Sequence, residues 1–189
     1  MAAPLDPDFL QREAEGVRRD LGLDDTLGVL GQVHIVGSAA LGLMVRRDLD
    51  LTIVCDRLDV LELYAAGASL VRHPHVRELT FRNDCGHWNI DPMYPDGVYW
   101  GIDYREGDVR WNLDIWFVDE PDRQPDLAHV REFPARLTPE TREAIMKIKS
   151  LWCDRPEYGG VVRSYDIYIA VLDHGVRTTG DFDAFLKSR

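Results

Sequence analysis

The chain has 189 residues, which suits one ordinary domain with room for a small addition. Hydrophobic residues make up 45% of it and charged residues 29%, a balance that excludes a disordered, collagen-like or coiled-coil protein. The net charge of −11 disfavours a broad surface that grips nucleic-acid phosphates, although it leaves room for a local basic groove.

The three cysteines, Cys55, Cys85 and Cys153, are widely separated and odd in number, so they predict no disulfide framework. The N-terminal segment has neither the basic start nor the apolar stretch of a signal peptide. The longest nearly apolar run, residues 35–45, is too short to span a bilayer. Together these features predict a cytoplasmic protein.

Hydrophobic periodicity predicts mixed helices and strands first and helices alone afterwards. In the first part, helices are expected at residues 6–21, 39–46 and 60–71, and strands at 32–36, 49–55, 76–82, 98–105 and 109–118. A proline-rich connector is expected at 121–139, followed by helices at 139–152, 164–174 and 182–187.

The segment 33–54 carries the first chemical signal. A short strand leads into Gly37-Ser38 and then into a brief helix. The glycine lets a ligand approach the backbone, and the serine hydroxyl and the free amides of a helix start favour a phosphate. Taken alone, the pair is more typical of an ordinary strand-to-helix turn with a serine cap.

Two aspartates, Asp48 and Asp50, open the next predicted strand. Because side chains alternate along a strand, both carboxylates point to one face while Leu49 points to the other. Two carboxylates held in this way repel each other unless a cation joins them, and oxygen ligands suit Mg²⁺. The simpler alternative is a strand start whose two acids lie in solvent.

A third carboxylate is expected to complete such a site. Asp114 lies within a predicted strand of otherwise strong β character, where an acid is costly unless it has a partner such as a metal. Asp103, on the neighbouring predicted strand, is the rival candidate.

The Gly37-Ser38 turn, the Asp48-Leu49-Asp50 strand and the distant Asp114 resemble the motif of the polymerase-β-like nucleotidyltransferase superfamily. The resemblance implies an α+β fold, with a mixed sheet flanked by helices and a small helical region behind it. It implies a catalytic domain at residues 1–125 and a packed helical region at 126–189.

The resemblance also implies a reaction. A nucleoside monophosphate would move from a nucleoside triphosphate such as ATP to a hydroxyl-bearing acceptor, with release of pyrophosphate. Asp48, Asp50 and Asp114 would be catalytic residues and ligands of two Mg²⁺ ions, with Asp114 as candidate base. Gly37 and Ser38 would hold the triphosphate.

The helical region resembles that of small bacterial members of the superfamily, including antibiotic-modifying and toxin or abortive-infection enzymes. That likeness implies a helical lysine on the nucleotide phosphates, either Lys147 or Lys149, and contributions from Arg155 and Asp166. Lys147 and Lys149 flank the apolar stripe of their helix on opposite sides, so the pattern does not choose between them.

The acceptor is left open between a small molecule such as an antibiotic and a tRNA or protein, and the oligomeric state is not indicated. The alternative is a catalytically silent module of the same fold that binds nucleotides or another protein. A zinc site built from His73, His75, Cys85 and His87 is not expected, because their spacing differs from the paired cysteines of structural zinc sites.

Overall fold

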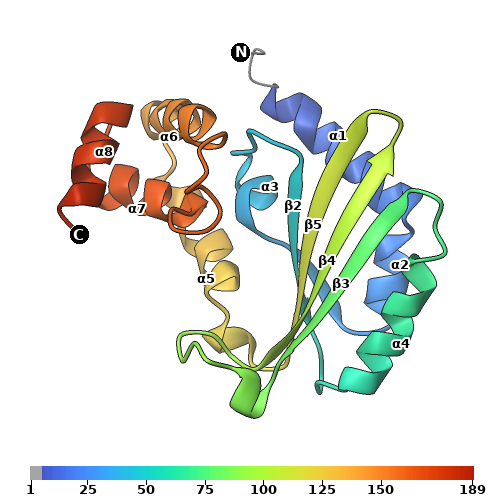
Figure 1. The fold of residues 1–189 in the computed structure, drawn as a ribbon. Helices are drawn as coiled ribbons and strands as arrows, with labels where there is room; N and C mark the ends of the chain where they lie inside the picture. The colour runs from blue at the N-terminus through green and yellow to red at the C-terminus, as the bar shows by residue number, and fades with distance from the viewer. Residues whose placement is uncertain (1–5) are drawn as a thin grey trace.

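The computed structural model describes residues 6–189, which form a five-stranded sheet with helices on both of its faces (Figure 1). The strands are β1 (Gln32–Ile35), β2 (Asp48–Val54), β3 (Val76–Asp84), β4 (Gly97–Glu106) and β5 (Val109–Val118). Their order is β1-β2-β5-β4-β3, with β2 and β5 parallel and every other neighbouring pair antiparallel. The predicted α+β class with a mixed sheet is therefore confirmed.

The helices divide between the two faces of the sheet. They are α1 (Pro7–Asp20), α2 (Leu23–Gly28), α3 (Gly37–Leu41), α4 (Val60–Leu70), α5 (Pro125–Glu132), α6 (Pro139–Trp152), α7 (Ser164–His174) and α8 (Thr179–Lys187). Helices α1, α2 and α4 cover one face, whereas α3 and the C-terminal helices α5 to α8 lie on the other side (Figure 1). Within residues 6–189, no helix has the length and apolar character needed to cross a membrane.

Three helices differ from the sequence prediction. Helix α2 was not predicted, because its six residues are too few to show a clear helical period. Helix α5 lies inside the expected connector, where Pro125 occupies a first-turn position that suits proline. Helix α3 ends at Leu41 rather than 46, because Gly42 takes a left-handed conformation (φ +65°) that ends the helix.

Side-chain alternation on the two central strands decides which face is apolar. On β2, Leu49, Leu51 and Ile53 are fully buried beneath the helices of the first face. On β5, Leu113, Ile115 and Phe117 are buried on the same side, each directly opposite its partner in β2. The intervening residues of both strands therefore point to the face beside α3.

Buried side chains gather in two cores. The first joins the sheet to α1, α2 and α4, and its buried members lie between Leu10 and Phe117. The second is built from α6, α7 and α8, but it also includes Leu41 and Leu43 from the segment after β1. The chain thus crosses from one core to the other within α3 and its continuation. The division into residues 1–125 and 126–189 stays a prediction.

Candidate functional site

Three aspartates meet on the face of the sheet that α3 borders. Asp48 and Asp50 are two positions apart in β2, and Asp50 lies directly opposite Asp114 of β5 in the parallel register. Neighbouring strands are about 4.8 Å apart, so the side chains of Asp50 and Asp114 project from adjacent strands on the same face of the sheet. The structure therefore brings together the three acids that the sequence singled out.

Gly37 packs directly on this acidic group. Its φ of +61° is in the left-handed region, and a Cβ atom placed there would lie 2.3 Å from Oδ2 of Asp50. Any other residue would strain the backbone and displace the carboxylate. The glycine at the start of α3 is thus required for the close approach of the turn to the acids.

The Asp50 carboxylate is held in an environment that disfavours its charge. Burial, with help from the nearby Asp48 and Asp114, raises its pKa well above the ordinary value. Within residues 6–189, no side chain or backbone group makes a hydrogen bond or an ion pair with this carboxylate. A half-buried acid without such a partner is a suitable seat for a cation.

The Asp114 carboxylate is fixed by a tyrosine. The Tyr99 hydroxyl of β4 donates a hydrogen bond to Asp114 Oδ1 at 2.5 Å, which leaves Oδ2 free of that contact. Burial raises the pKa of Asp114, while the bond from Tyr99 opposes this rise. The guanidinium of Arg82 lies over the Tyr99 ring, 4.8 Å from its centre, and limits the freedom of the tyrosine.

The structure gives Asp114 and Asp103, the two candidates for the third carboxylate, different environments. Asp103 pairs with Arg105 at 2.8 Å and with Arg110 at 3.0 Å. The hydrogen bond from Arg105 holds the pKa of Asp103 below its usual value. Since Asp103 lies opposite Asn112 and is already neutralised, it has no need of a cation, whereas Asp114 lies next to Asp50.

Two lysines of α6 have opposite environments. Lys149 is 1% exposed, and its Nζ donates to Ser38 Oγ at 2.6 Å, to the Leu43 carbonyl at 2.7 Å and to the Tyr168 hydroxyl at 3.1 Å. Burial lowers the pKa of Lys149. Lys147 is exposed and makes no hydrogen bond or ion pair within the described residues. Only Lys149 is therefore placed at the Gly37-Ser38 turn.

Arg155 and Asp166, which the family likeness also implies, make their contacts within the C-terminal helical region. Arg155 pairs with Asp183 at 3.3 Å and lies over the ring of Trp152. Asp166 accepts a hydrogen bond from the backbone amide of Arg163 at 2.8 Å, as a cap of its own helix. The structure does not join Arg155 or Asp166 to the three acids.

Several contacts of the site were not predicted from the sequence. Tyr99 and Tyr168 contact Asp114 and Ser38, respectively, and Tyr158 lies under the guanidinium of Arg46, 5.0 Å from it. A tyrosine in an apolar strand or helix is usually read as core, so its hydroxyl contacts are invisible until the fold is known. Arg46, which precedes β2, pairs with Asp48 at 2.7 Å.

A polar cavity of about 270 Å³ opens beside the acids. It is lined by residues of β2, β3, β4 and β5 and by one preceding arginine: Arg46, Asp48, Glu78, Thr80, Tyr99, Gly101, Ile102, Asp103, Arg110, Asn112, Leu113 and Asp114. Asp48 and Asp114 thus face a space that a small ligand or one end of a larger ligand can enter.

The acids fit a hard divalent cation. Their donors are oxygens alone, which suits Mg²⁺ or Mn²⁺ and not the softer metals. Burial raises the pKa of Asp50 most and the neighbouring acids add to the rise, and a bound cation would relieve the repulsion between these acids. The chemistry of the donor set therefore agrees with the magnesium site expected from the sequence.

Comparisons with known proteins agree with the fold. No protein-family model and no curated protein matches the sequence. Among solved structures, similar folds occur in the GLD-2/RNP-8 complex (TM-score 0.59, 14% identity), a cytoplasmic RNA terminal U-transferase (0.57, 18%) and the Cid1 poly(U) polymerase with Mg 3′-dATP bound (0.56, 16%).

These matches cover 87%, 87% and 86% of this chain, but 58%, 48% and 48% of the respective neighbours, so the chain spans about half of their length. At this identity the likeness establishes the fold. The predicted resemblance to polymerase-β-like nucleotidyltransferases is confirmed at that level.

Replacing Tyr99 by phenylalanine removes the hydrogen bond that favours the charged form of Asp114. We expect the pKa of Asp114 to rise in Tyr99→Phe, as measured by ¹³C NMR titration of the aspartate carboxyl groups in metal-free protein. Tyr64→Phe is the control, because Tyr64 is 62% exposed and distant in sequence from the site. An unchanged Asp114 titration would contradict the positioning role of Tyr99.

Replacing Asp50 by asparagine removes a carboxylate that folding buries close to two other acids. An acid with a raised folded-state pKa stabilises the protein fully below its unfolded pKa, and this stabilisation is lost as the pH rises through the folded value. We therefore expect Asp50→Asn to have a higher Tm than the wild type at pH 8 in chelator, with the difference shrinking toward pH 4. Calorimetry measures the Tm of both proteins at each pH. A lower Tm for the variant at pH 8 would contradict the argument.

Proposed function

We propose that the protein is a Mg²⁺-dependent nucleotidyltransferase, which moves a nucleoside monophosphate from a nucleoside triphosphate to a hydroxyl-bearing acceptor and releases pyrophosphate. The observation that carries the proposal is the convergence of Asp48, Asp50 and Asp114 beside a glycine-serine turn that a buried lysine contacts. The fold it shares with RNA terminal transferases supports the same reaction class.

In this proposal, Asp48, Asp50 and Asp114 hold the magnesium, which supplies charge stabilisation and lowers the pKa of the acceptor hydroxyl when it is bound. Ser38 and the amides at the start of α3 bind the triphosphate. Lys149 holds Ser38 in place by donating a hydrogen bond to its hydroxyl. Arg46, Asp48 and Asp114 line the cavity that would admit the acceptor.

Asp114 is the proposed base. Tyr99 orients the carboxylate through Oδ1, which leaves Oδ2 for the proton of the acceptor. The acceptor hydroxyl would give its proton to Oδ2 of Asp114, and its oxygen would form a bond to the α-phosphorus. The bond from that phosphorus to the bridging oxygen of the β-phosphate would break, and pyrophosphate would leave.

The acceptor is proposed as either a small hydroxylated molecule, such as an antibiotic, or a tRNA or protein. The cavity of about 270 Å³ and the net charge of −11 favour the small molecule. The polynucleotide-extending activities named for the neighbours favour an RNA end. We also propose a cytoplasmic location, in keeping with three cysteines that are all free.

One observation favours the silent alternative, a nucleotide-binding or protein-interaction module on this fold. Arg46 donates to Asp48 through two nitrogens, at 3.1 and 2.7 Å, so one acid of the group is neutralised by the chain itself. An active enzyme would need to exchange this ion pair for a cation. The Arg46→Gln variant tests this alternative, because it removes the ion pair and leaves Asp48 free to bind a cation. A binding module should still transfer no nucleotide in this variant.

The reaction is tested with α-labelled nucleoside triphosphates and Mg²⁺, offered with tRNA, with protein substrates and with a panel of hydroxylated small molecules. Label should move to one class of acceptor with wild-type protein and not with Asp50→Asn, whose fold is checked by circular dichroism. Equal labelling by both proteins would refute the assignment of the acids. Tight nucleotide binding without turnover on every acceptor would favour the silent module.

The two lysines of α6 form a matched pair for testing nucleotide binding. Lys149→Met removes the cation beneath Ser38, whereas Lys147→Met removes an exposed one. A hydrogen bond to a charged group contributes about 1.5–3 kcal/mol, so we expect nucleotide affinity to fall about tenfold or more in Lys149→Met.

Isothermal titration with a non-hydrolysable triphosphate measures this effect, and Lys147→Met should bind as the wild type does. If both variants, each shown to be folded, kept full affinity, Lys149 would have no part in holding the nucleotide.

A further inference from the structure

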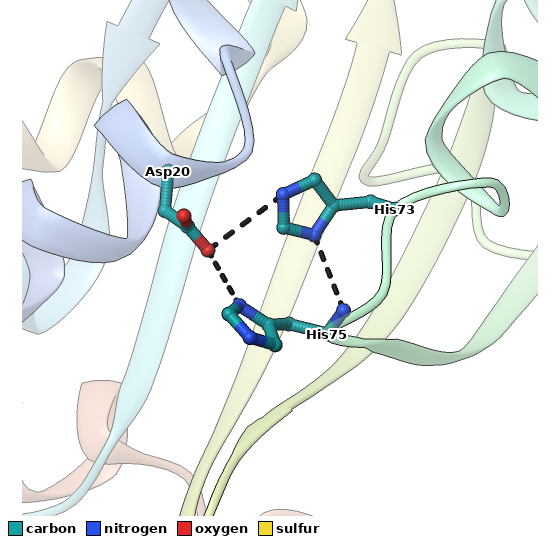
Figure 2. Close-up of side chains that lie close together, drawn as sticks. All are labelled: Asp20, His73 and His75. Atoms are coloured by element: carbon teal, nitrogen blue, oxygen red, sulfur yellow. Dashed lines mark hydrogen bonds and ion pairs between the residues drawn. The ribbon is translucent and has the colours of Figure 1, made fainter.

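A second group of metal-ligating side chains lies away from the acids. It consists of Asp20, the last residue of α1, with His73 and His75 from the segment between α4 and β3 (Figure 2). One ligand atom of each residue lies within 4.8 Å of the others. The group adjoins Tyr104, which points to the face of the sheet covered by α1, α2 and α4, whereas Asp114 points to the opposite face.

The side chains already point toward a common centre (Figure 2). Oδ2 of Asp20 lies 2.8 Å from Nδ1 of His75 and 3.7 Å from Nε2 of His73. A tetrahedral zinc ion with bonds of 2.0–2.1 Å requires ligand atoms about 3.3 Å apart, and the two observed separations bracket that distance. Small side-chain adjustments would therefore suffice to enclose an ion.

We propose that Asp20, His73 and His75 form a zinc-binding site, with one position left to water or to an exogenous ligand. Two imidazoles and one carboxylate are the donors that a borderline metal prefers, while Mg²⁺ prefers oxygen alone. The side chains are 40%, 23% and 31% exposed, respectively, so an ion can reach them from solvent.

Tyr104 supports the carboxylate of this site. Its hydroxyl lies 2.8 Å from Oδ2 of Asp20 and 3.2 Å from Oε2 of Glu106, so a buried tyrosine fixes the position of the aspartate. His75 also contacts this carboxylate at 2.8 Å, so two side chains hold Asp20 in position.

Two hydrogen bonds bear on how the site would bind an ion. Nδ1 of His73 accepts a weak hydrogen bond of 3.3 Å from the backbone amide of His75, so Nε2 is the His73 nitrogen that faces Asp20. The hydrogen bond between Nδ1 of His75 and Oδ2 of Asp20, at 2.8 Å, would be replaced by bonds from both atoms to the metal.

The sequence alone did not favour zinc, because the spacing of His73, His75, Cys85 and His87 differs from that of the paired cysteines in structural zinc sites. The structure places those two elsewhere: the Cys85 thiol faces the Gly97 carbonyl, and His87 packs on Trp88. The third ligand instead comes from Asp20, 55 positions before His75. A bound ion would connect the end of α1 to the start of β3, so its direct effect is on stability.

The test measures Zn²⁺ binding by isothermal titration in the full chain, with millimolar Mg²⁺ present, together with the visible spectrum of Co²⁺ bound in its place. We expect one ion per chain, an intense tetrahedral Co²⁺ spectrum, and a rise in Tm of about 5–10 °C at a hundredfold excess over Kd. His73→Gln and His75→Gln should each weaken binding at least tenfold, and His87→Gln, at an exposed position, should not.

An Asp48→Asn/Asp50→Asn variant separates this site from the acids of the other face. It should keep the zinc stoichiometry and the Tm shift. Loss of binding in that variant, or unchanged binding in folded His75→Gln, would overturn the proposal, as would a Co²⁺ spectrum typical of the octahedral aqueous ion. None of these outcomes depends on whether the protein transfers nucleotides.

Discussion

The parallel pairing of β2 with β5 decides where the chemistry of this protein lies. Because Leu49, Leu51 and Ile53 are buried on one face, Asp48 and Asp50 must point to the other, and the same alternation in β5 carries Asp114 with them. A slip of one residue would bury the acids. The apolar core thus holds three mutually repelling carboxylates together, and their repulsion makes the site receptive to a cation.

The two candidate ion sites illustrate how one fold can offer different metals different donors. On the face beside α3, the carboxylate oxygens of Asp48, Asp50 and Asp114 lie close together, and the turn at Gly37 packs against the Asp50 carboxylate. On the side covered by α1, α2 and α4, two imidazoles lie close to the carboxylate of Asp20 at the end of α1. Hard and borderline cations therefore need not compete for the same residues, since each is selected by ligand chemistry rather than by charge alone.

Local patterns predicted all five strands and the three acids, because strand alternation and the Gly-Ser turn are visible over a few residues. Helices α2 and α5 were missed because short segments carry little periodic signal. The distinction between Lys147 and Lys149 depends on how α6 is rotated against α3, and the roles of Tyr99 and Tyr168 depend on tertiary contacts. No local pattern links Asp20 to His75, so that pair required the fold.

The segment that follows β1 belongs to both halves of the molecule. Ala39 packs in the core of the sheet, whereas Leu41 and Leu43 pack among the C-terminal helices, and the Leu43 carbonyl accepts a bond from Lys149. A fragment cut at residue 125 would retain every aspartate of the group, yet it would leave two leucines in water and the serine turn without its anchor. The segment after β1 therefore makes contacts with the core of the sheet and with the C-terminal helices at the same time.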